Sequence, residues 1–278
     1  MSMTTTDSEV VHVGIDAGVM TLTLDSPGNR NALSRALGTQ LSSGLTRAAT
    51  DESVRAVVLT HAGGTFCAGA DLGEALKRGA SAEEASAEAT SSMVELMRTI
   101  LELPKPVIAH VDGHVRAGGF GLLGATDIAL AGPKGTFAVT EARLGLAPSV
   151  ISLVLVPKMT ARGAGRYFLT GEKFDASVAA SIGVITQACD STEALTQSLG
   201  EILDGIRRAS PVGLAASKEL TTTSVRAEFE RLAQRRSQES ATLFAGDDAR
   251  AGMEAFLSKG RPPWDLTATQ ADTGATRT

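Results

Sequence analysis

The segment from Val107 to Glu141 constrains this chain more than any other, because it has the pattern of strand, glycine turn, helix, strand and acid. Val107 to Val111 is a β-branched run, as in buried strands. Small residues from Ala117 to Gly124 then mark a place where a helix can begin close to another backbone. Backbone N–H groups in such a turn can approach a bound atom, and the start of a helix adds positive potential. The segment can therefore hold a developing negative charge.

Three interpretations of these glycines compete. Gly119, Gly121 and Gly124 spell G-x-G-x-x-G, with an acid at Glu141 downstream, which is typical of dinucleotide binding. That fingerprint should open a helix directly after a strand, whereas residues 113–118 intervene here. The glycines could instead serve only tight packing between a helix and a strand. We favour the third interpretation, a site for an oxyanion.

The composition is that of an ordinary globular protein. Hydrophobic residues make up 43% of the 278 residues, enough for a sizeable core. The net charge of -5 offers no basic surface for nucleic acid or an anionic membrane, and no apolar run reaches transmembrane length. The sequence therefore predicts neither a nucleic-acid partner nor a membrane partner.

The cysteines and the N-terminus bear on the compartment. Cys67 and Cys189 are too few for a disulfide framework and lack metal-ligand spacing, so no metal site is predicted. The first residues, M-S-M-T-T-T-D-S-E, include no basic or apolar region that would direct export. We expect a cytoplasmic protein.

The first part of the chain alternates strands and helices. β-rich segments at 10–13 and 19–24 should form a hairpin, and 54–60 has the pattern of a buried strand. A helix is expected between them at 34–49. A second glycine turn follows at 61–72, where Asp71 could cap the next helix. The long helix expected at 82–103 carries an apolar stripe assigned to the core: Met93, Leu96, Met97, Ile100 and Leu101.

The rest of the chain is mostly helical in pattern. We expect short helices at 149–156, 161–170 and 175–182, a last strand at 184–186 and a helix at 192–209. After Pro211, helical patterns cover 212–220, 225–244 and 247–258.

Several motifs in order carry a family resemblance. They are V-R-A-V-V-L-T-H-A-G-G-T-F-C-A-G-A-D-L at 54–72, P-V-I-A-H-V-D-G-H-V-R-A-G-G-F-G-L at 106–122 and E-A-R-L-G-L-A-P at 141–148. N-R-N-A-L-S at 29–34, Y-F-L-T-G-E-K-F-D-A at 167–176 and A-F-L-S-K-G at 255–260 add to them. Together they resemble the crotonase, or enoyl-CoA hydratase/isomerase, superfamily over about residues 10–265.

The resemblance implies an α/β fold, a crotonase-like spiral of β-β-α units with a C-terminal helical trimerisation region. On this basis we divide the chain into a disordered N-terminus (1–9), a spiral core (10–209), a helical region (210–265) and a disordered tail (266–278). A homotrimer or a dimer of trimers is the expected assembly.

The resemblance also implies a site for an acyl-CoA substrate. A thioester carbonyl would lie between the backbone N–H groups of Ala70 and Gly118, and Glu141 matches the acid/base glutamate. Proton transfer next to a thioester places negative charge on its oxygen, which such donors stabilise. No cofactor is expected, because coenzyme A is part of the substrate.

Other residues are expected to bind coenzyme A. The turn that holds Ala68, Asp71 and Leu72 would contact it mainly through backbone atoms. Arg30 and Lys259 could meet its phosphates, with Lys259 reaching in from a neighbouring subunit as an alternative. For both cations the competing interpretation is an exposed charge without a role.

One departure from the family pattern leaves the reaction open. Hydratases of the superfamily carry a second glutamate three residues after the oxyanion glycine, and Gly121 occupies that position here. Isomerases that shift a double bond between carbons work with the glutamate at Glu141 alone. Ser149 stands where dienoyl-CoA isomerases have an aspartate. The leading hypothesis is a hydratase-like enzyme, and the alternatives are a Δ3,Δ2-enoyl-CoA isomerase and a CoA-thioester binding module without turnover.

Three histidines and a cysteine lie near the glycine turns. His61, His110 and His114 match no catalytic position of the family, and histidines at strand ends are more often structural. Of these, His114 is the alternative base. Cys67 has no identifiable base partner and is interpreted as a small buried residue.

Overall fold

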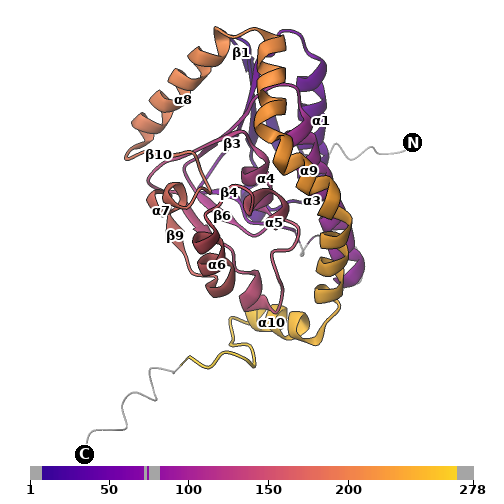
Figure 1. The fold of residues 1–278 in the computed structure, drawn as a ribbon. Coiled ribbons are helices and arrows are strands. Elements are labelled where there is room, and N and C mark those ends of the chain that lie inside the picture. Colours follow the sequence, from indigo (N-terminus) through magenta and orange to yellow (C-terminus); the bar gives the residue numbers. More distant parts are fainter. Residues whose placement is uncertain (1–7, 72–73, 75–81, 268–278) are drawn as a thin grey trace, which may run out of the picture.

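The computed structural model describes residues 8–71, 74 and 82–267. Its larger sheet has six strands in the order β1-β2-β3-β5-β7-β10 (Figure 1). β1 and β2 are antiparallel, and every later pair is parallel. The strands are β1 Val11–Asp16, β2 Val19–Leu24, β3 Ala56–His61, β5 Val107–Val111, β7 Ile128–Ala131 and β10 Gln187–Ala188.

The smaller sheet has four short strands in the order β4-β6-β8-β9. They are β4 Thr65–Cys67, β6 His114–Arg116, β8 Thr136–Ala138 and β9 Phe174–Asp175. The chain passes from β3 to β4, from β5 to β6 and from β7 to β8, so each of these larger-sheet strands is followed by a strand of the smaller sheet. This repetition confirms the predicted spiral of β-β-α units.

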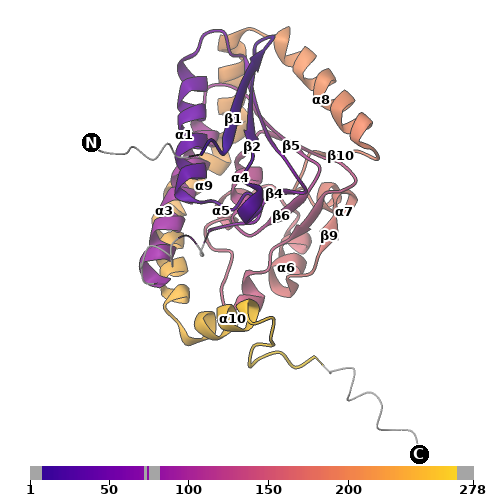
Figure 2. The same cartoon turned by 180° about the vertical axis from the view of Figure 1, so that it is seen from behind.

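Helices cover both faces of the larger sheet. α1, α3 and α9 lie together on one side and α8 lies on the other, as both views show (Figures 1 and 2). The α-helices are α1 Arg35–Thr50, α3 Ala82–Glu102, α4 Gly119–Ala125, α5 Ser152–Leu155, α6 Ala161–Thr170, α7 Ala176–Ser181, α8 Thr192–Arg207, α9 Pro211–Phe244 and α10 Asp247–Leu257. Two 3₁₀ turns, η1 Pro27–Asn29 and η2 Glu141–Leu144, complete the structure. No helix in the described part of the chain is long and apolar enough to cross a membrane.

Strand alternation explains this double covering. On β3, Val57 and Leu59 belong to the main core, whereas Ala56 and Val58 pack in a second cluster with α8 residues such as Leu203. A strand that is buried on both faces needs a continuous apolar run. The sequence of β3 supplies it.

The predicted hairpin forms with a two-residue turn. Asp16 pairs with Val19, so Ala17 and Gly18 make the connection. Their φ angles are 45° and 80°, and two positive φ values are typical of the tight turn that matches the twist of a hairpin. The prediction of a hairpin is confirmed.

The helical region differs from the sequence prediction in one respect. The segments expected at 212–220 and 225–244 form one helix, α9, of 34 residues. The polar run T-T-T-S between them does not interrupt the helix. Its threonine hydroxyls bond to carbonyls of the preceding turn, from Thr222 to Lys218 at 2.7 Å and from Thr223 to Glu219 at 2.7 Å, so they do not compete for the backbone N–H groups. α9 begins at Ser210, whose hydroxyl accepts from the N–H of Gly213.

A second difference concerns the last strand, which was expected at 184–186. Val184 and Ile185 instead donate their N–H groups to the carbonyl of Ala179, closing the end of α7. The strand β10 therefore begins at Gln187. The expectations for residues 1–7 and 268–278 lie outside the described residues.

Candidate active site

Three parallel strands of the smaller sheet end at one edge, and the predicted catalytic residues follow them there. β4 pairs with β6 and β6 with β8, all in parallel. Ala70 comes just after β4, Gly118 just after β6 and Glu141 just after β8. Residues that are far apart in the sequence are thereby brought to a common edge.

The turn after β4 packs directly on the turn after β6. Gly69 has a φ of 100° and Ala117 a φ of 43°. A Cβ placed on Gly69 would lie 2.9 Å from the Cβ of Ala117 and 3.3 Å from the N atom of Gly118. So close an approach, at a positive φ, requires glycine at position 69.

The N–H groups of Ala70 and Gly118 are available for a ligand. Leu33 donates to the carbonyl of Gly69 at 2.7 Å and accepts from the N–H of Asp71 at 3.4 Å. Because hydrogen-bonding groups alternate in direction along an extended chain, the N–H of Ala70 points away from Leu33. Gly118 precedes α4, whose first N–H groups have no acceptor within the helix. Neither N–H has a backbone acceptor among the described residues.

Glu141 carries a carboxylate suited to proton transfer near neutral pH. It opens η2 after Thr140, and its Oε2 atom is buried with no hydrogen-bond partner in the described structure. Burial raises the pKa of Glu141 to about 7, and hydrogen bonds from the N–H groups of Thr140 and Glu141 offset part of the rise. A carboxyl group with this pKa can accept or donate a proton at little cost.

The described residues around Glu141 fix the position of its turn, η2, but do not form an ion pair with its carboxylate. Arg143 turns away and donates from Nε to the carbonyl of Thr170 at 2.7 Å. α10 packs against η2 so closely that a Cβ on Gly252 would lie 2.5 Å from the carbonyl oxygen of Leu144. The C-terminal helices therefore support the turn that carries the acid.

The space beside Gly121 is occupied by methionine. A Cβ on Gly121 would lie 2.5 Å from Sδ of Met93 and 3.1 Å from Sδ of Met97. Met93 also contacts the other turn, because a Cβ on Gly118 would lie 2.9 Å from its Cε. The assignment of Met93 to the core is correct, since it is 7% exposed, but that assignment missed its contact with both glycines. The one signal in the sequence for this contact was that Met93 is the first residue of the apolar stripe.

The residues predicted to bind coenzyme A are placed as follows. Ala68 is half-buried in the turn after β4 and Ala70 is exposed. Both oxygens of Asp71 have protein partners, since Oδ2 accepts from Asn29 Nδ2 at 2.7 Å and Oδ1 from the N–H of Glu74 at 2.9 Å. This carboxylate therefore holds the turn in place. It accepts from the N–H three residues later, as expected for the helix cap predicted at Asp71. Leu72 lies outside the described residues.

The two predicted cations are both exposed and lie at turns. Arg30 follows η1 with a φ of 58°, and Lys259 follows α10 with a φ of 55°. The loop of Arg30 is tied to the turn after β4 through the Asn29–Asp71 hydrogen bond. The parts of Arg30 and Lys259 in binding phosphates stay predictions.

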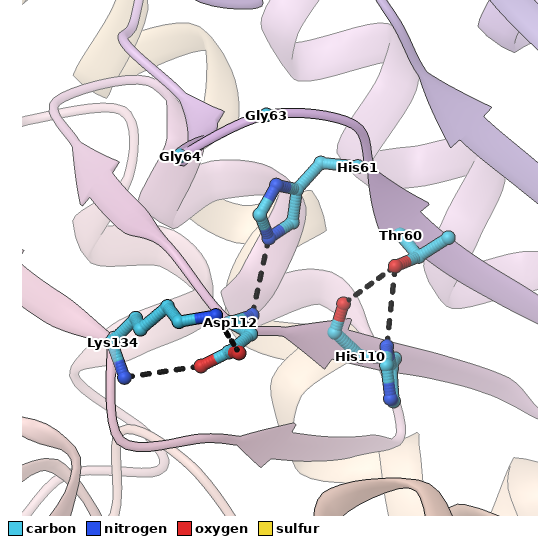
Figure 3. A pocket seen from close by; sticks show the side chains of 7 residues that line it. All are labelled: Thr60, His61, Gly63, Gly64, His110, Asp112 and Lys134. Atoms are coloured by element: carbon cyan, nitrogen blue, oxygen red, sulfur yellow. Dashed lines mark hydrogen bonds and ion pairs between the residues drawn. The ribbon is translucent and has the colours of Figure 1, made fainter. Parts of the chain in front are cut away.

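His61 and His110 lie at the opposite edge of the smaller sheet. They line a pocket of about 340 Å³, together with Thr60, Gly63, Gly64, Asp112 and Lys134 (Figure 3). These residues lie at the ends of β3 and β5 and just before β4, β6 and β8, whereas the candidate catalytic residues follow those short strands. The pocket is therefore separate from the candidate active site.

The hydrogen bonds of this pocket are structural. Nε2 of His61 accepts from the N–H of Asp112 at 3.1 Å, and Nδ1 of His110 lies 3.2 Å from Oγ1 of Thr60. Asp112 pairs with Lys134 at 3.4 Å. His114 is exposed at the start of β6 and bonds Thr136 through Nδ1 at 2.7 Å. All three histidines are thus placed away from the edge that carries Glu141.

Cys67 is fully buried at the end of β4. Its Sγ atom accepts from the N–H of Gly69 at 3.5 Å. Burial raises the pKa of its thiol to about 12, so no thiolate forms at neutral pH. The residue is the small buried group that was expected. No cluster of side chains in the described ranges could hold a metal ion.

Comparisons with known proteins identify the family of this chain. A family model described as enoyl-CoA hydratase/isomerase matches residues 14–267. Enoyl-CoA hydratase EchA19 of Mycobacterium tuberculosis is 32% identical over 243 residues, 87% of this chain and 91% of that protein. 1,2-Epoxyphenylacetyl-CoA isomerase of Escherichia coli is 30% identical over 256 residues, 89% of this chain and 95% of that protein.

Solved structures give the same result. The crystal structure of an enoyl-CoA hydratase from Mycobacterium avium matches with a TM-score of 0.85 and 53% identity, over 93% of this chain and 99% of that one. The paired sheets with their two glycine turns define a protein of the crotonase fold. The chain belongs to the enoyl-CoA hydratase/isomerase family, and it is an enzyme of that family.

Proposed function

We propose that this enzyme hydrates 2-enoyl-CoA thioesters, with Ala70 and Gly118 holding the thioester oxygen and Glu141 transferring the protons. The observation that carries the proposal is the common edge of β4, β6 and β8. Two backbone N–H groups with no backbone acceptor among the described residues, and a buried carboxylate whose Oε2 atom has no partner there, follow these neighbouring strands. Relatives named as enoyl-CoA hydratases support the choice of substrate class.

The proposed hydration needs one acid/base group acting twice. Glu141 takes a proton from water as the water oxygen forms a bond to C3, and the electron pair of the C2–C3 double bond moves to the thioester oxygen as an enolate. The N–H groups of Ala70 and Gly118 stabilise that charge, by roughly 2.7–4 kcal/mol for each donor if they act as oxyanion donors do elsewhere. Glu141 then returns the proton to C2, which gives the 3-hydroxyacyl-CoA.

A second candidate is the isomerisation of 3-enoyl-CoA to 2-enoyl-CoA. It is favoured by one observation, that Met93 fills the space beside Gly121 where a second acid would be. Here Glu141 removes a proton from C2 of the 3-enoyl-CoA, and a dienolate forms with its negative charge on the thioester oxygen. The carboxyl group then delivers the proton to C4, which leaves the double bond between C2 and C3. Both reactions use the same oxyanion site and the same carboxylate.

Binding of coenzyme A is proposed to use the turn of Ala68 and Leu72 through backbone atoms, with Arg30 and Lys259 near the phosphates. Arg30 and Lys259 are exposed, so they can reach a phosphate without losing an internal ion pair. No cofactor other than coenzyme A within the substrate is proposed. The predicted cytoplasmic location and the trimeric assembly belong to the same proposal.

One experiment separates the three hypotheses. The purified protein is incubated with crotonyl-CoA and, separately, with a 3-enoyl-CoA, and the conjugated enone is followed by absorbance. Hydration is seen as its loss and isomerisation as its gain, whereas calorimetric binding without either change indicates a binding module. Crotonate serves as the control ligand, because binding as tight as that of crotonyl-CoA would contradict a CoA-thioester site.

A further inference from the structure

We infer that Met93 is a specificity-determining residue that occupies the space beside Gly121 and so leaves Glu141 as the single carboxylate of the site. The inference rests on the proposed function, because it concerns which of two reactions the Glu141 site carries out. Its basis is the position of one thioether against both Gly118 and Gly121.

The two contacts place Met93 at the candidate oxyanion turn. Its Cε atom is 2.9 Å from the Cβ position of Gly118, and its Sδ atom is 2.5 Å from that of Gly121. Contacts under 3.0 Å are closer than Cβ atoms make in proteins. Any side chain at 121 must therefore displace this methionine.

The chemistry of the methionine differs from that of the group it excludes. A carboxylate at 121 could orient a second water or share the proton transfers with Glu141. A thioether is apolar and neither donates nor holds a proton. With Met93 in place, Glu141 is the matched proton carrier in either reaction, and a second acid has no room beside Gly121.

Backbone conformation does not itself exclude a side chain at 121. Gly121 lies inside α4, and its φ is not positive. A glycine inside a helix is less favourable than alanine because it loses more backbone entropy on folding, so replacing it should normally stabilise the protein. The obstacle is therefore the neighbouring side chain, and the obstacle can be removed by mutation.

The first test is a stability cycle made of Gly121→Ala, Met93→Ala and the double variant. We expect Gly121→Ala to lower the melting temperature by only about 2–4 °C, because the contacted Sδ atom belongs to a flexible side chain that can move aside. In the Met93→Ala background the same change should raise the melting temperature. Met97→Ala is the matched control, because its Sδ atom is farther from the Cβ position, at 3.1 Å, and it should relieve less of the loss. The same shift for Gly121→Ala in both Met93 backgrounds would overturn the inference.

The second test measures the ratio of hydration to isomerisation on the two enoyl-CoA substrates. Gly121→Glu with Met93→Ala should raise this ratio at least about tenfold over Met93→Ala alone, since an added acid/base group typically contributes roughly 10²–10⁴-fold. Gly121→Glu with Met97→Ala should not. A ratio that is unchanged by the Met93 substitution in folded protein would also overturn the inference.

The two tests separate this inference from the proposed function. The stability cycle uses no substrate, so it reports on Met93 whatever the reaction is. A wild-type protein that turns over neither enoyl-CoA would overturn the proposed function, and the specificity role with it. Wild-type turnover together with an absent stability coupling would overturn the inference alone.

Discussion

Lys218 of α9 and Asp127, which precedes β7, form a buried ion pair, with 2.8 Å between Nζ and Oδ2. The same ammonium donates to the carbonyls of Ile100 at 2.8 Å and Lys105 at 3.1 Å. Asp127 Oδ2 also accepts from the N–H of Val107 at 2.7 Å. One pair thus joins the longest helix to the end of α3 and the start of β5.

We predict that Lys218→Met destabilises the protein by about 3–5 kcal/mol, because it removes the ion-pair partner of the Asp127 carboxylate and leaves only the more distant charge of Lys158 near it. Urea unfolding followed by circular dichroism measures the change. Arg231→Met on the same helix is the control, since Arg231 forms only an exposed pair with Glu228 and should cost no more than about 1 kcal/mol. Equal effects of the two substitutions would contradict the importance of the buried pair.

We predict that Glu141→Gln lowers kcat by roughly 10²–10⁴-fold with little change in acyl-CoA affinity, because glutamine keeps the size of the side chain but cannot carry the proton. Steady-state kinetics on the better enoyl-CoA substrate gives kcat, and calorimetry with a saturated acyl-CoA gives affinity. Glu172→Gln is the control, since that carboxylate pairs with Arg166 and has no predicted role. Wild-type kcat in Glu141→Gln would show that another residue transfers the proton.

The raised pKa of Glu141 predicts a pH dependence with a definite sign. If Glu141 acts first as a base, kcat/KM should rise with pH and level off above a pKa of about 7. On folding, Glu141 also keeps a proton that it has lost in the unfolded state between pH 4.5 and 7, so its contribution to stability falls as the pH rises through this window. Glu141→Gln should remove that loss, which amounts to roughly 3 kcal/mol. Parallel stability curves for the two proteins would contradict the assigned pKa.

His61 and His110 should make the protein less stable in mild acid. Burial lowers the pKa of both rings from the ordinary value of 6.5, and for His110 the neighbouring His61 lowers it further. The folded state therefore binds fewer protons than the unfolded state as the pH falls below 6.5, and stability is lost. The free energy of unfolding of His61→Asn/His110→Gln, taken relative to wild type at the same pH, should therefore be higher at about pH 5.5 than at about pH 7.5, because Glu141 is present in both proteins.

His12 provides the control with the opposite sign. A hydrogen bond to Asp25 raises the pKa of the exposed His12 ring, so this residue adds stability in acid that is lost as the pH rises. His12→Gln should therefore make the acid loss slightly larger. An unchanged loss in the His61/His110 variant would show that these rings do not titrate on folding.

We predict a trimer or a dimer of trimers that depends on the C-terminal helices. Phe256 and Leu257 are adjacent large apolar residues near the end of α10, 66% and 73% exposed, and can pack against another subunit. Light scattering should give a trimer or hexamer mass for the wild type and a smaller mass for Phe256→Asp/Leu257→Asp. Leu169→Asp, at an exposed apolar residue of α6, should leave the mass unchanged. A monomeric wild type at micromolar concentration would refute the prediction.

Local patterns in the sequence determined much of the fold and the candidate site. The strands Val19–Leu24 and Val107–Val111 and the helix Ala161–Thr170 have the predicted bounds, because apolar periodicity and turn residues are read over short windows. Motifs placed Ala70, Gly118 and Glu141, and the parallel order of the short strands brings them to one edge. The sequence predicted a break in the helix at residues 221–224, which α9 does not have. The threonine hydroxyls there bond to carbonyls of the preceding turn.

Only the tertiary structure decided which distant residues act on that edge. The family motifs showed that Gly121 stands where hydratases carry a second glutamate. That Met93 fills the space beside Gly121 depends on how α3 packs against α4. Likewise, the pKa of Glu141 is raised by burial, and its turn packs against the distant helix α10. The ion pair of Lys218 with Asp127 also joins residues that are far apart in the sequence. Such contacts leave no periodic trace in the sequence, because they are set by the packing of whole elements.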